Sequence, residues 1–289
     1  MGGSIIIIRE TRNISTSSGW RKALLLRPAE TSGQRPGVLW IHGGGYATGM
    51  PEMAFFSRPR DLVEKHGAVV LSPAYRLSWQ APYPAALDDC YTALRYLRDC
   101  ADELGVRSDQ IMVGGERAGG GLCAALCMLA RDKGEISIAY QMPLYPMLDC
   151  DDTESSRDNH GRIWNTRRNH AAWKLYLRKL YGKPGISPYA SPAKQTDYAG
   201  LPPAYSFVSE GEPFYAETLA YIENLRRAGV AAAVDVYPGN THAFDMMRPH
   251  WRVSKQAAQV FNERFRFAAA NCFAPQPVRD VSPDRKRCR

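Results

Sequence analysis

The stretch Gly114-Gly115-Glu116-Arg117-Ala118-Gly119-Gly120 decides how this sequence is interpreted. It follows an apolar run at residues 110–113 and precedes a helical pattern, so it joins a strand to a helix. A turn of the form G-x-S-x-G in this position is a nucleophile elbow, in which small flanking residues permit a sharp bend that presents the central side chain. Residues 115–119 fit this form except at the centre, where arginine replaces serine. An ordinary glycine-rich turn is the alternative.

Around this turn, short β-rich apolar runs alternate with helical stretches. We expect strands at residues 5–9, 23–26, 38–42, 68–74, 110–113, 138–144, 204–208 and 232–236. We expect helices near residues 53–66, 85–104, 118–133, 214–228 and 253–267. Alternation of this kind predicts βαβ units and a mostly parallel sheet covered on both faces, so the expected fold class is α/β.

A second glycine-rich stretch, His42-Gly43-Gly44-Gly45, directly follows the apolar run at residues 38–41. Glycines leave the backbone N–H groups unshielded, and such donors can hold the oxyanion that develops in acyl transfer. A plain tight turn is the alternative. Three glycines after a histidine at the end of a strand favour the oxyanion interpretation.

The sequence also offers a base and an acid. His242 follows the last expected strand, where a general base is placed in this arrangement. Glu212 follows the strand at residues 204–208, which gives the chain order nucleophile position, acid, histidine. Glu210 is the rival acid, and Glu212 is preferred.

These motifs together make the chain resemble the hormone-sensitive-lipase-like branch of the α/β-hydrolases, esterases with an H-G-G-G oxyanion motif. The resemblance covers about residues 36–267 and includes the segments Tyr75-Arg76-Leu77, Tyr83-Pro84-Ala85-Ala86, Tyr189-Ala190-Ser191-Pro192 and Leu201-Pro202-Pro203. It implies an α/β-hydrolase fold, short-acyl ester substrates and no cofactor. It further implies oxyanion donors at the N–H groups of Gly43, Gly44 and Ala118, with Glu212 orienting His242 as the base.

An arginine cannot serve as the nucleophile at this elbow. Its guanidinium has no usable lone pair and stays protonated at physiological pH, so His242 could not activate it. The cation opposes the helix dipole by ~0.3–1 kcal/mol, and burying it unpaired would cost several kcal/mol more. We therefore expect a compensating anion beside Arg117: Glu212, Glu116 or a bound carboxylate.

Two functions follow from these residues. In the first, the site is that of a carboxylesterase in which Arg117 is a substitution that leaves the rest intact and the chain inactive. In the second, the chain is a noncatalytic relative that binds a carboxylate ligand through Arg117 and the oxyanion donors. The histidine and its acid favour the esterase, because a receptor does not need them. A protein that keeps only the fold ranks last, since it would leave these residues unexplained.

One stretch interrupts the alternation. Residues 149–201 are polar and aromatic, with a helical pattern at 170–181 and no strand pattern. An insertion of this size is typical of a lid or cap, so residues 1–272 are expected to form one domain that carries it. The proline-containing tail 273–289 is expected to be disordered.

Three aromatic residues are candidates for the wall of a substrate pocket: Tyr46, which follows the glycines, and Trp164 and Trp173 of the insertion. Aromatic residues at such positions are as often packing residues, so both alternatives stay open. The acidic stretch 149–154 lacks the glycine and the distal glutamate of a calcium loop, and no metal site is expected.

Composition limits the remaining possibilities. The chain is 45% hydrophobic and 23% charged, as in globular proteins. No apolar run approaches the ~20 residues of a membrane span, and the isoleucine run at 5–8 is too short for a secretory signal, so a cytoplasmic location is expected.

Seven cysteines without a C-x-x-C pair disfavour a disulfide framework and a zinc site. Of the net charge of +8, +3 lies in the tail; we interpret the rest as spread over the body and expect no nucleic-acid partner.

Overall fold

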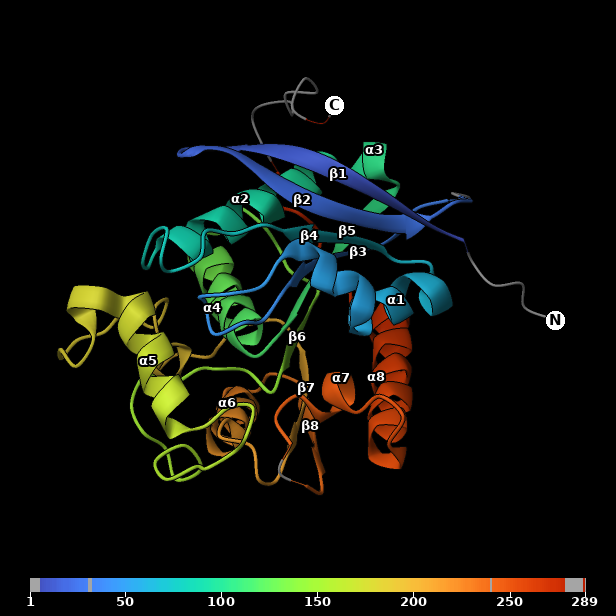
Figure 1. Ribbon diagram of the computed structural model, residues 1–289. Helices are drawn as coiled ribbons and strands as arrows, with labels where there is room; N and C mark the ends of the chain where they lie inside the picture. The colour runs from blue at the N-terminus through green and yellow to red at the C-terminus, as the bar shows by residue number, and fades with distance from the viewer. Residues whose placement is uncertain (1–5, 31–32, 240, 279–287, 289) are drawn as a thin grey trace.

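The computed structural model describes residues 6–30, 33–239, 241–278 and 288. Its centre is an eight-stranded sheet with the order β1-β2-β4-β3-β5-β6-β7-β8 (Figure 1). The strands are β1 (Ile7–Thr16), β2 (Gly19–Pro28), β3 (Arg35–Ile41), β4 (Val69–Pro73), β5 (Val106–Glu116), β6 (Tyr140–Leu144), β7 (Ala204–Ser209) and β8 (Ala232–Tyr237). The helices are η1 (Pro51–Phe56), α1 (Arg58–His66), α2 (Ala85–Asp99), α3 (Ala101–Leu104), α4 (Ala118–Lys133), α5 (Thr166–Leu177), η2 (Arg178–Leu180), η3 (Pro192–Lys194), α6 (Tyr215–Arg227), α7 (Phe244–Met247) and α8 (Arg252–Asn271).

The direction of the strands determines where the loops meet. β1 and β2 form an antiparallel hairpin, and β2 joins the rest of the sheet by antiparallel pairing with β4. The other neighbouring pairs, from β4–β3 through β7–β8, are parallel. Because parallel strands end at the same edge of a sheet, the loops after β3, β5, β7 and β8 share one edge. Arg117, Glu212, His242 and the expected oxyanion donors lie in or beside these loops.

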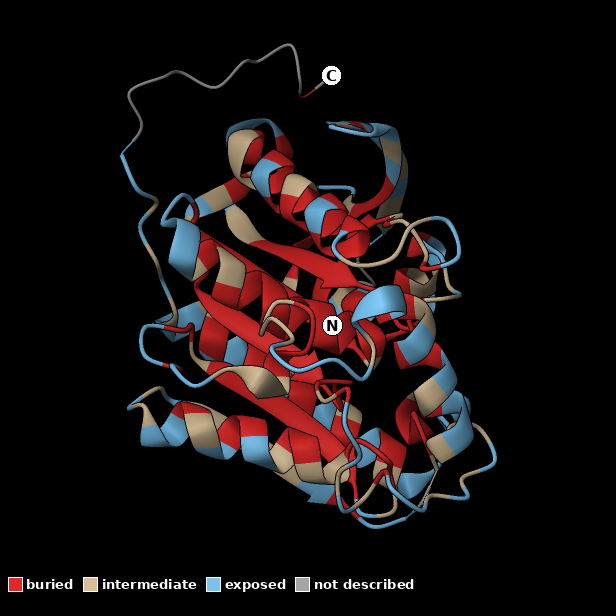
Figure 2. Ribbon diagram, turned by 90° about the vertical axis from the view of Figure 1, so that its left-hand side faces the viewer, coloured by how far each residue is buried: buried red, intermediate tan, exposed pale blue. Residues whose placement is uncertain are grey.

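Two apolar clusters cover the sheet, one on each face. Leu39 and Ile41 of β3 pack in the cluster that holds α2, α4 and α6, whereas Val38 and Trp40 pack in the cluster that holds α1 and α8. Alternate residues of a strand point to opposite faces, so one apolar run serves both clusters. Figure 2 shows the result as buried strands between helices whose outer sides are exposed. The expected α/β class with a mostly parallel sheet is confirmed.

Two of the differences from the expected elements are helices that are divided by a local feature of the chain. The helix expected at residues 53–66 is divided at Ser57, whose backbone is extended, and Pro59 lies in the first turn of the new helix α1. Proline has no N–H to donate, and it is tolerated in a first turn, where that donor has no partner in the helix. The helix expected at 85–104 is likewise divided at Cys100. Among the described residues, no helix is both long and apolar enough to span a membrane.

The segment between β6 and β7 contains α5, η2 and η3, and no strand lies within residues 145–203, all of which the structure describes. Its helix α5 is capped by Asn165, whose side chain accepts a hydrogen bond from the N–H of Arg168 at 3.1 Å. Trp173 and Tyr176 of α5 are buried in the cluster that holds α2 and α4. This segment is therefore packed against the sheet domain by a buried aromatic face.

The tail differs from the expected disorder where the structure describes it. The N–H of Ala274 donates to the carbonyl of Asp109 at 2.8 Å, and Gln276 donates to the carbonyls of Ser108 and Ser137. Cys288 is buried and forms a disulfide with Cys100, a single bridge that the sequence did not predict. Their separation of 188 residues left no local signal for this pairing. Residues 279–287 and 289 lie outside the described part of the chain.

A thiol titration tests this disulfide. In denaturant without reductant we expect five reactive thiols, those of Cys90, Cys123, Cys127, Cys150 and Cys272, and seven after reduction. Because a disulfide restricts the unfolded chain, Cys288→Ser should lower the free energy of unfolding of the oxidised protein by roughly 2–4 kcal/mol in urea titration. Cys272→Ser is the matched control and should change it little. Seven thiols before reduction would contradict the pairing.

Candidate functional site

Arg117 lies at the bend between β5 and α4. Its backbone has φ 59° and ψ −121°, a conformation that side chains other than glycine rarely adopt. Neighbouring backbone groups hold it there: its N–H donates to the carbonyl of Leu144 at 3.1 Å, and its carbonyl accepts from the N–H groups of Gly121 and Met147. A Cβ on Gly119 would lie 2.0 Å from the carbonyl oxygen of Ile41, so α4 approaches β3 only with glycine at this position. This is the geometry expected of an elbow, and arginine occupies its central position.

The glycine loop after β3 lies directly beside the elbow. Gly44 has φ 118°, and a Cβ there would lie 2.2 Å from the carbonyl oxygen of Thr48. The ring of His42 stacks on Tyr75 with the centroids 4.3 Å apart, and its Nδ1 donates to the carbonyl of Gly43 at 2.8 Å. Burial lowers the pKa of His42 to about 4, against the raising effect of that hydrogen bond. A neutral histidine therefore fixes the loop.

This loop and the elbow present unengaged donors. Within the described residues, no hydrogen bond uses the N–H groups of Gly43, Gly44 or Ala118. Ala118 is the first residue of α4, where N–H groups have no partner inside the helix. The N–H groups at which we expected oxyanion donors are thus free to receive a ligand atom.

His242 and Glu212 come together at the same edge. Nδ1 of His242 is hydrogen-bonded to Oε1 of Glu212, and the two side chains are 3% and 1% exposed. Glu210, the rival acid, is exposed. The ring of Trp164 stacks on His242 at 5.8 Å, and Phe214 meets it edge-on at 5.5 Å. Carboxylate and aromatic neighbours thus hold the imidazole in one orientation and leave Nε2 as its second polar atom.

The side chain of Arg117 lies against the glycine loop. A Cβ on Gly43 would be 2.5 Å from Nε of Arg117, and Nη2 of Arg117 lies 3.9 Å from Sδ of Met246. No described residue accepts a hydrogen bond from that buried Nε. Neither Glu116 nor Glu212 forms a salt bridge with Arg117 in the part of the chain that the structure describes, so of the three anions expected beside Arg117 these two do not pair with it and a bound carboxylate stays a prediction. Glu212 is engaged by His242 instead.

Glu116 is a buried carboxyl group behind the elbow. Its Oε2 accepts a hydrogen bond from Nε1 of Trp40 at 2.6 Å, while no described residue donates to its Oε1. Burial raises the pKa of Glu116 to about 7, and the positive charge of Arg117 acts in the opposite direction. Arg117 thus influences Glu116 through its charge without a direct ion pair.

A buried aspartate that no sequence motif indicates supports the histidine loop. Asp245, three residues after His242, is buried, accepts a hydrogen bond from the Tyr145 hydroxyl at 3.0 Å and lies 3.3 Å from Nε of Arg58. These contacts join α1, the end of β6 and α7. No spacing in the sequence indicates them, because the three residues come from distant segments.

The candidate pocket aromatics separate into two groups. Tyr46 and Trp173 are buried in the core, and Tyr46 stacks on Tyr176 with the ring centroids 4.0 Å apart, so the structure places them in core packing. Trp164 lies in the site, since its ring stacks on His242. The same ring is so close to Gly45 that a Cβ on this glycine would lie 2.4 Å from it. A pocket of about 600 Å³ opens beside this group and is lined by Gly211, Thr241, His242, Arg248 and residues 158–163.

Two groups of described residues have the spacing to hold a metal ion, and neither lies at this site. One comprises Cys100, Glu103 and Cys288, whose two cysteines form the disulfide. The other comprises Asp149, Cys150 and Asp151, and Lys194 forms salt bridges with both aspartates. The candidate site itself consists of backbone N–H groups, an arginine, and a histidine paired with a glutamate.

The chain is similar in sequence to one family model and to known proteins. The model of a family described as having the alpha/beta hydrolase fold matches residues 38–246. Carboxylesterase NlhH of Mycobacterium tuberculosis is 30% identical over 216 residues, which is 72% of this chain and 66% of that protein. The matches to the first curated relatives each span 66% of the relative's length, slightly less than two thirds.

Solved structures of esterases superpose on most of the chain. A bacterial heroin esterase has a TM-score of 0.87 and 32% identity, covering 91% of this chain and 84% of its own. An esterase of Pyrobaculum calidifontis has a TM-score of 0.82 and 31% identity, covering 92% of this chain and 87% of its own. The chain belongs to the α/β-hydrolase fold family, in its hormone-sensitive-lipase-like esterase branch.

Proposed function

We propose that this chain carries the site of a short-acyl carboxylesterase of the Ser-His-Glu type, in which Arg117 takes the place of the nucleophile and makes the chain inactive. The observation that carries the proposal is the buried Glu212–His242 pair beside an elbow with unengaged N–H groups. A histidine held by a carboxylate at Nδ1 has Nε2 available as a general base. The relatives named above are esterases, which supports the same reaction class.

An esterase site needs oxyanion donors, a general base and a nucleophile. The residues described above would supply the first two. The N–H groups of Gly43, Gly44 and Ala118 would stabilise the oxyanion of the tetrahedral intermediate, and His242 would accept and return the proton. Arg117 cannot supply the third, because a protonated guanidinium is not a nucleophile. Its side chain also lies against Gly43 and so occupies space beside the donors.

We further infer that residues 149–201 act as a cap on one domain formed by residues 1–272. Trp164 supports this role, since it belongs to the segment and lies against both His242 and Gly45. A cytoplasmic location stays a prediction, and the Cys100–Cys288 disulfide is the feature that a reducing compartment would oppose.

One observation favours a second candidate, a noncatalytic protein that binds a carboxylate ligand. The buried Nε of Arg117 has no described acceptor and lies beside unengaged N–H groups, a combination that suits a carboxylate. The Glu212–His242 pair is not needed for such binding, and for this reason the esterase site remains the preferred conclusion.

The chain as it stands should show no turnover that depends on His242. Without a nucleophile the base has nothing to activate, and loss of the nucleophile in such triads costs about 10⁶-fold in rate. We therefore expect this chain and its His242→Ala variant to hydrolyse short p-nitrophenyl esters at the same background rate. Turnover that disappears with His242→Ala would show that another nucleophile acts in the site.

Arg117→Ser should restore esterase activity. The donors belong to the backbone, and the elbow is held by hydrogen bonds that do not use the side chain at position 117, so we expect a rise of at least about 10³-fold on short p-nitrophenyl esters, part of the loss attributed to the missing nucleophile. The matched control is Arg117→Ser combined with His242→Ala, which should return to background.

A folded but inactive serine variant would remove the support for the esterase. In that case, a rise in melting temperature on adding acetate or butyrate to the Arg117 form, absent from the serine variant, would favour the carboxylate-binding candidate.

The same substitution should change how stability depends on pH. Since the pKa of Glu116 is raised from 4.5 to about 7, the folded protein keeps a proton that the unfolded chain releases, and stability falls as pH rises through this range. Arg117→Ser removes the cation that lowers this pKa, so the variant should lose more stability between pH 5 and pH 8 in urea titration, about 1 kcal/mol more for a rise of one pKa unit. Adding Glu116→Gln to both proteins should abolish the difference. An unchanged pH dependence would contradict the coupling.

A further inference from the structure

The net charge of this chain is concentrated in one segment. Residues 157–183 hold eight lysines and arginines and one aspartate, a net charge of +7 in a chain whose total is +8. This corrects the expectation that the charge outside the tail is spread over the body. The segment contains α5 and η2 and the turn that leads into them.

All eight basic side chains are exposed, and none forms a salt bridge within the described residues. They are Arg157, Arg162, Arg167, Arg168, Lys174, Arg178, Lys179 and Lys183. Elsewhere, arginines such as Arg76 and Arg131 are paired with aspartates. Folding therefore does not neutralise this positive surface, and its charge is available to a partner.

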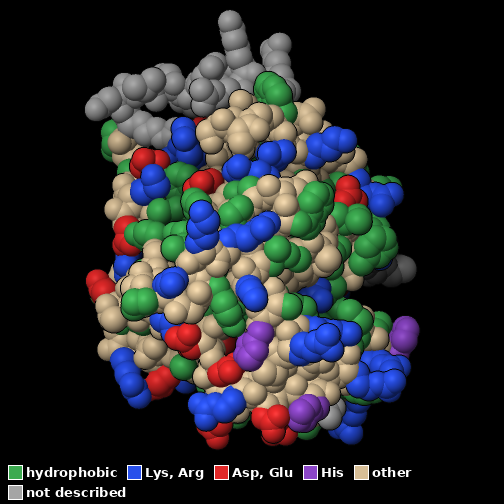
Figure 3. Space-filling view, turned by 60° about the vertical axis from the view of Figure 1, so that its left-hand side comes forward, with side chains coloured by type: hydrophobic (Ala, Val, Ile, Leu, Met, Phe, Trp, Pro, Cys, Tyr) green, Lys and Arg blue, Asp and Glu red, His purple; other side chains and the backbone are tan. Residues whose placement is uncertain are grey.

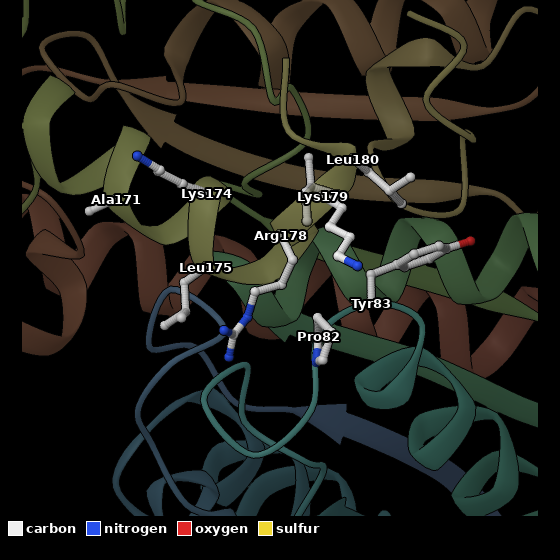
Figure 4. A pocket seen from close by; sticks show the side chains of 9 residues that line it. Pro82, Tyr83, Ala171, Lys174, Leu175, Arg178, Lys179 and Leu180 are labelled. Carbon is white, nitrogen blue, oxygen red and sulfur yellow. The ribbon is translucent and has the colours of Figure 1, made fainter. Parts of the chain in front are cut away.

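An apolar groove accompanies the charges. It has a volume of about 960 Å³ and runs between α5 and the loop before α2, with Pro82 and Tyr83 on one side and Leu175 and Leu180 on the other (Figure 4). Lys174, Arg178 and Lys179 also line it, and no acidic residue does. The groove thus combines apolar side chains with three cations.

Large apolar side chains are exposed at the same place. Leu180 is 44% exposed, and Trp79 is 60% exposed on the loop whose Ser78 carbonyl accepts a hydrogen bond from Nη2 of Arg178 at 3.2 Å. Figure 3, in which the side of the molecule that carries α5 comes forward, shows hydrophobic side chains beside lysines and arginines. Leucine and tryptophan next to basic residues are typical of surfaces that enter the interface of a bilayer.

We propose that the basic surface of residues 157–183, with its groove and with Trp79 and Leu180, is a docking surface for an anionic phospholipid bilayer. Lipid phosphates complement the unpaired lysines and arginines, and the apolar side chains enter the region of the acyl chains. Nucleic acid or an acidic protein would match the charge alone and would leave the groove and the exposed leucine and tryptophan without a role. This docking does not depend on any reaction at Arg117.

Co-sedimentation with vesicles tests the proposal on the full chain. We expect binding to vesicles of phosphatidylglycerol and phosphatidylcholine in equal parts, weakening as salt rises, and little binding to pure phosphatidylcholine. Lys174→Glu with Lys179→Glu should lower the partition coefficient about tenfold or more, since each basic residue near an anionic surface contributes about 1 kcal/mol. Leu180→Gln should weaken binding without changing its dependence on salt.

A matched control separates this surface from the overall charge. Lys22→Glu with Lys255→Glu makes the same change in net charge at two exposed lysines on β2 and α8, and it should retain binding. Equal loss in both double variants, at unchanged melting temperature, would overturn the proposal. Absence of binding to the anionic vesicles would overturn it as well, and retention on DNA or polyglutamate in that case would assign the surface to a macromolecular partner instead.

Discussion

The bend between β5 and α4 is the constraint on which the rest of this structure depends. Its backbone is fixed by hydrogen bonds to Leu144 and Met147 and by the close approach of Gly119 to β3, none of which involves the side chain at position 117. The bend therefore keeps its shape although arginine occupies the position at which a serine esterase carries its nucleophile. The loops after β3, β7 and β8 meet it because parallel strands end at one edge.

The site shows how a charged residue can be accommodated without an ion pair. The Arg117 side chain lies over Gly43, where the lack of a Cβ leaves room, and extends to the sulfur of Met246. Its charge is balanced in part at a distance by Glu116, a carboxyl group that burial would otherwise keep protonated to higher pH. Arginine at the elbow is thus compatible with the fold and alters the electrostatics around it.

Much of the fold and the residues that converge at the site could be predicted from the sequence, because glycines and short apolar runs have local meanings. The helix at Ala118–Lys133 and the Glu212–His242 pair follow from such signals. Contacts set by tertiary packing could not be predicted: the Cys100–Cys288 disulfide, the support of Asp245 by Arg58, and the burial of Tyr46 and Trp173 in the core. Of the anions expected beside Arg117, Glu212 pairs with His242 instead and Glu116 accepts from Trp40, whereas a bound carboxylate stays a prediction. The concentration of charge in residues 157–183 was visible in the sequence, but its exposure and its groove required the structure.

Trp164 links two parts of the site that come from segments far apart in the chain. Its indole fills the space that any side chain at position 45 would need, and the same ring stacks on the imidazole of His242. Positions 45 and 164 are therefore not free to vary independently. A relative with a larger residue in place of Gly45 must carry a smaller one in place of Trp164, and its histidine then loses the ring that stacks on it here. This single contact therefore predicts covariation between these two positions across homologues.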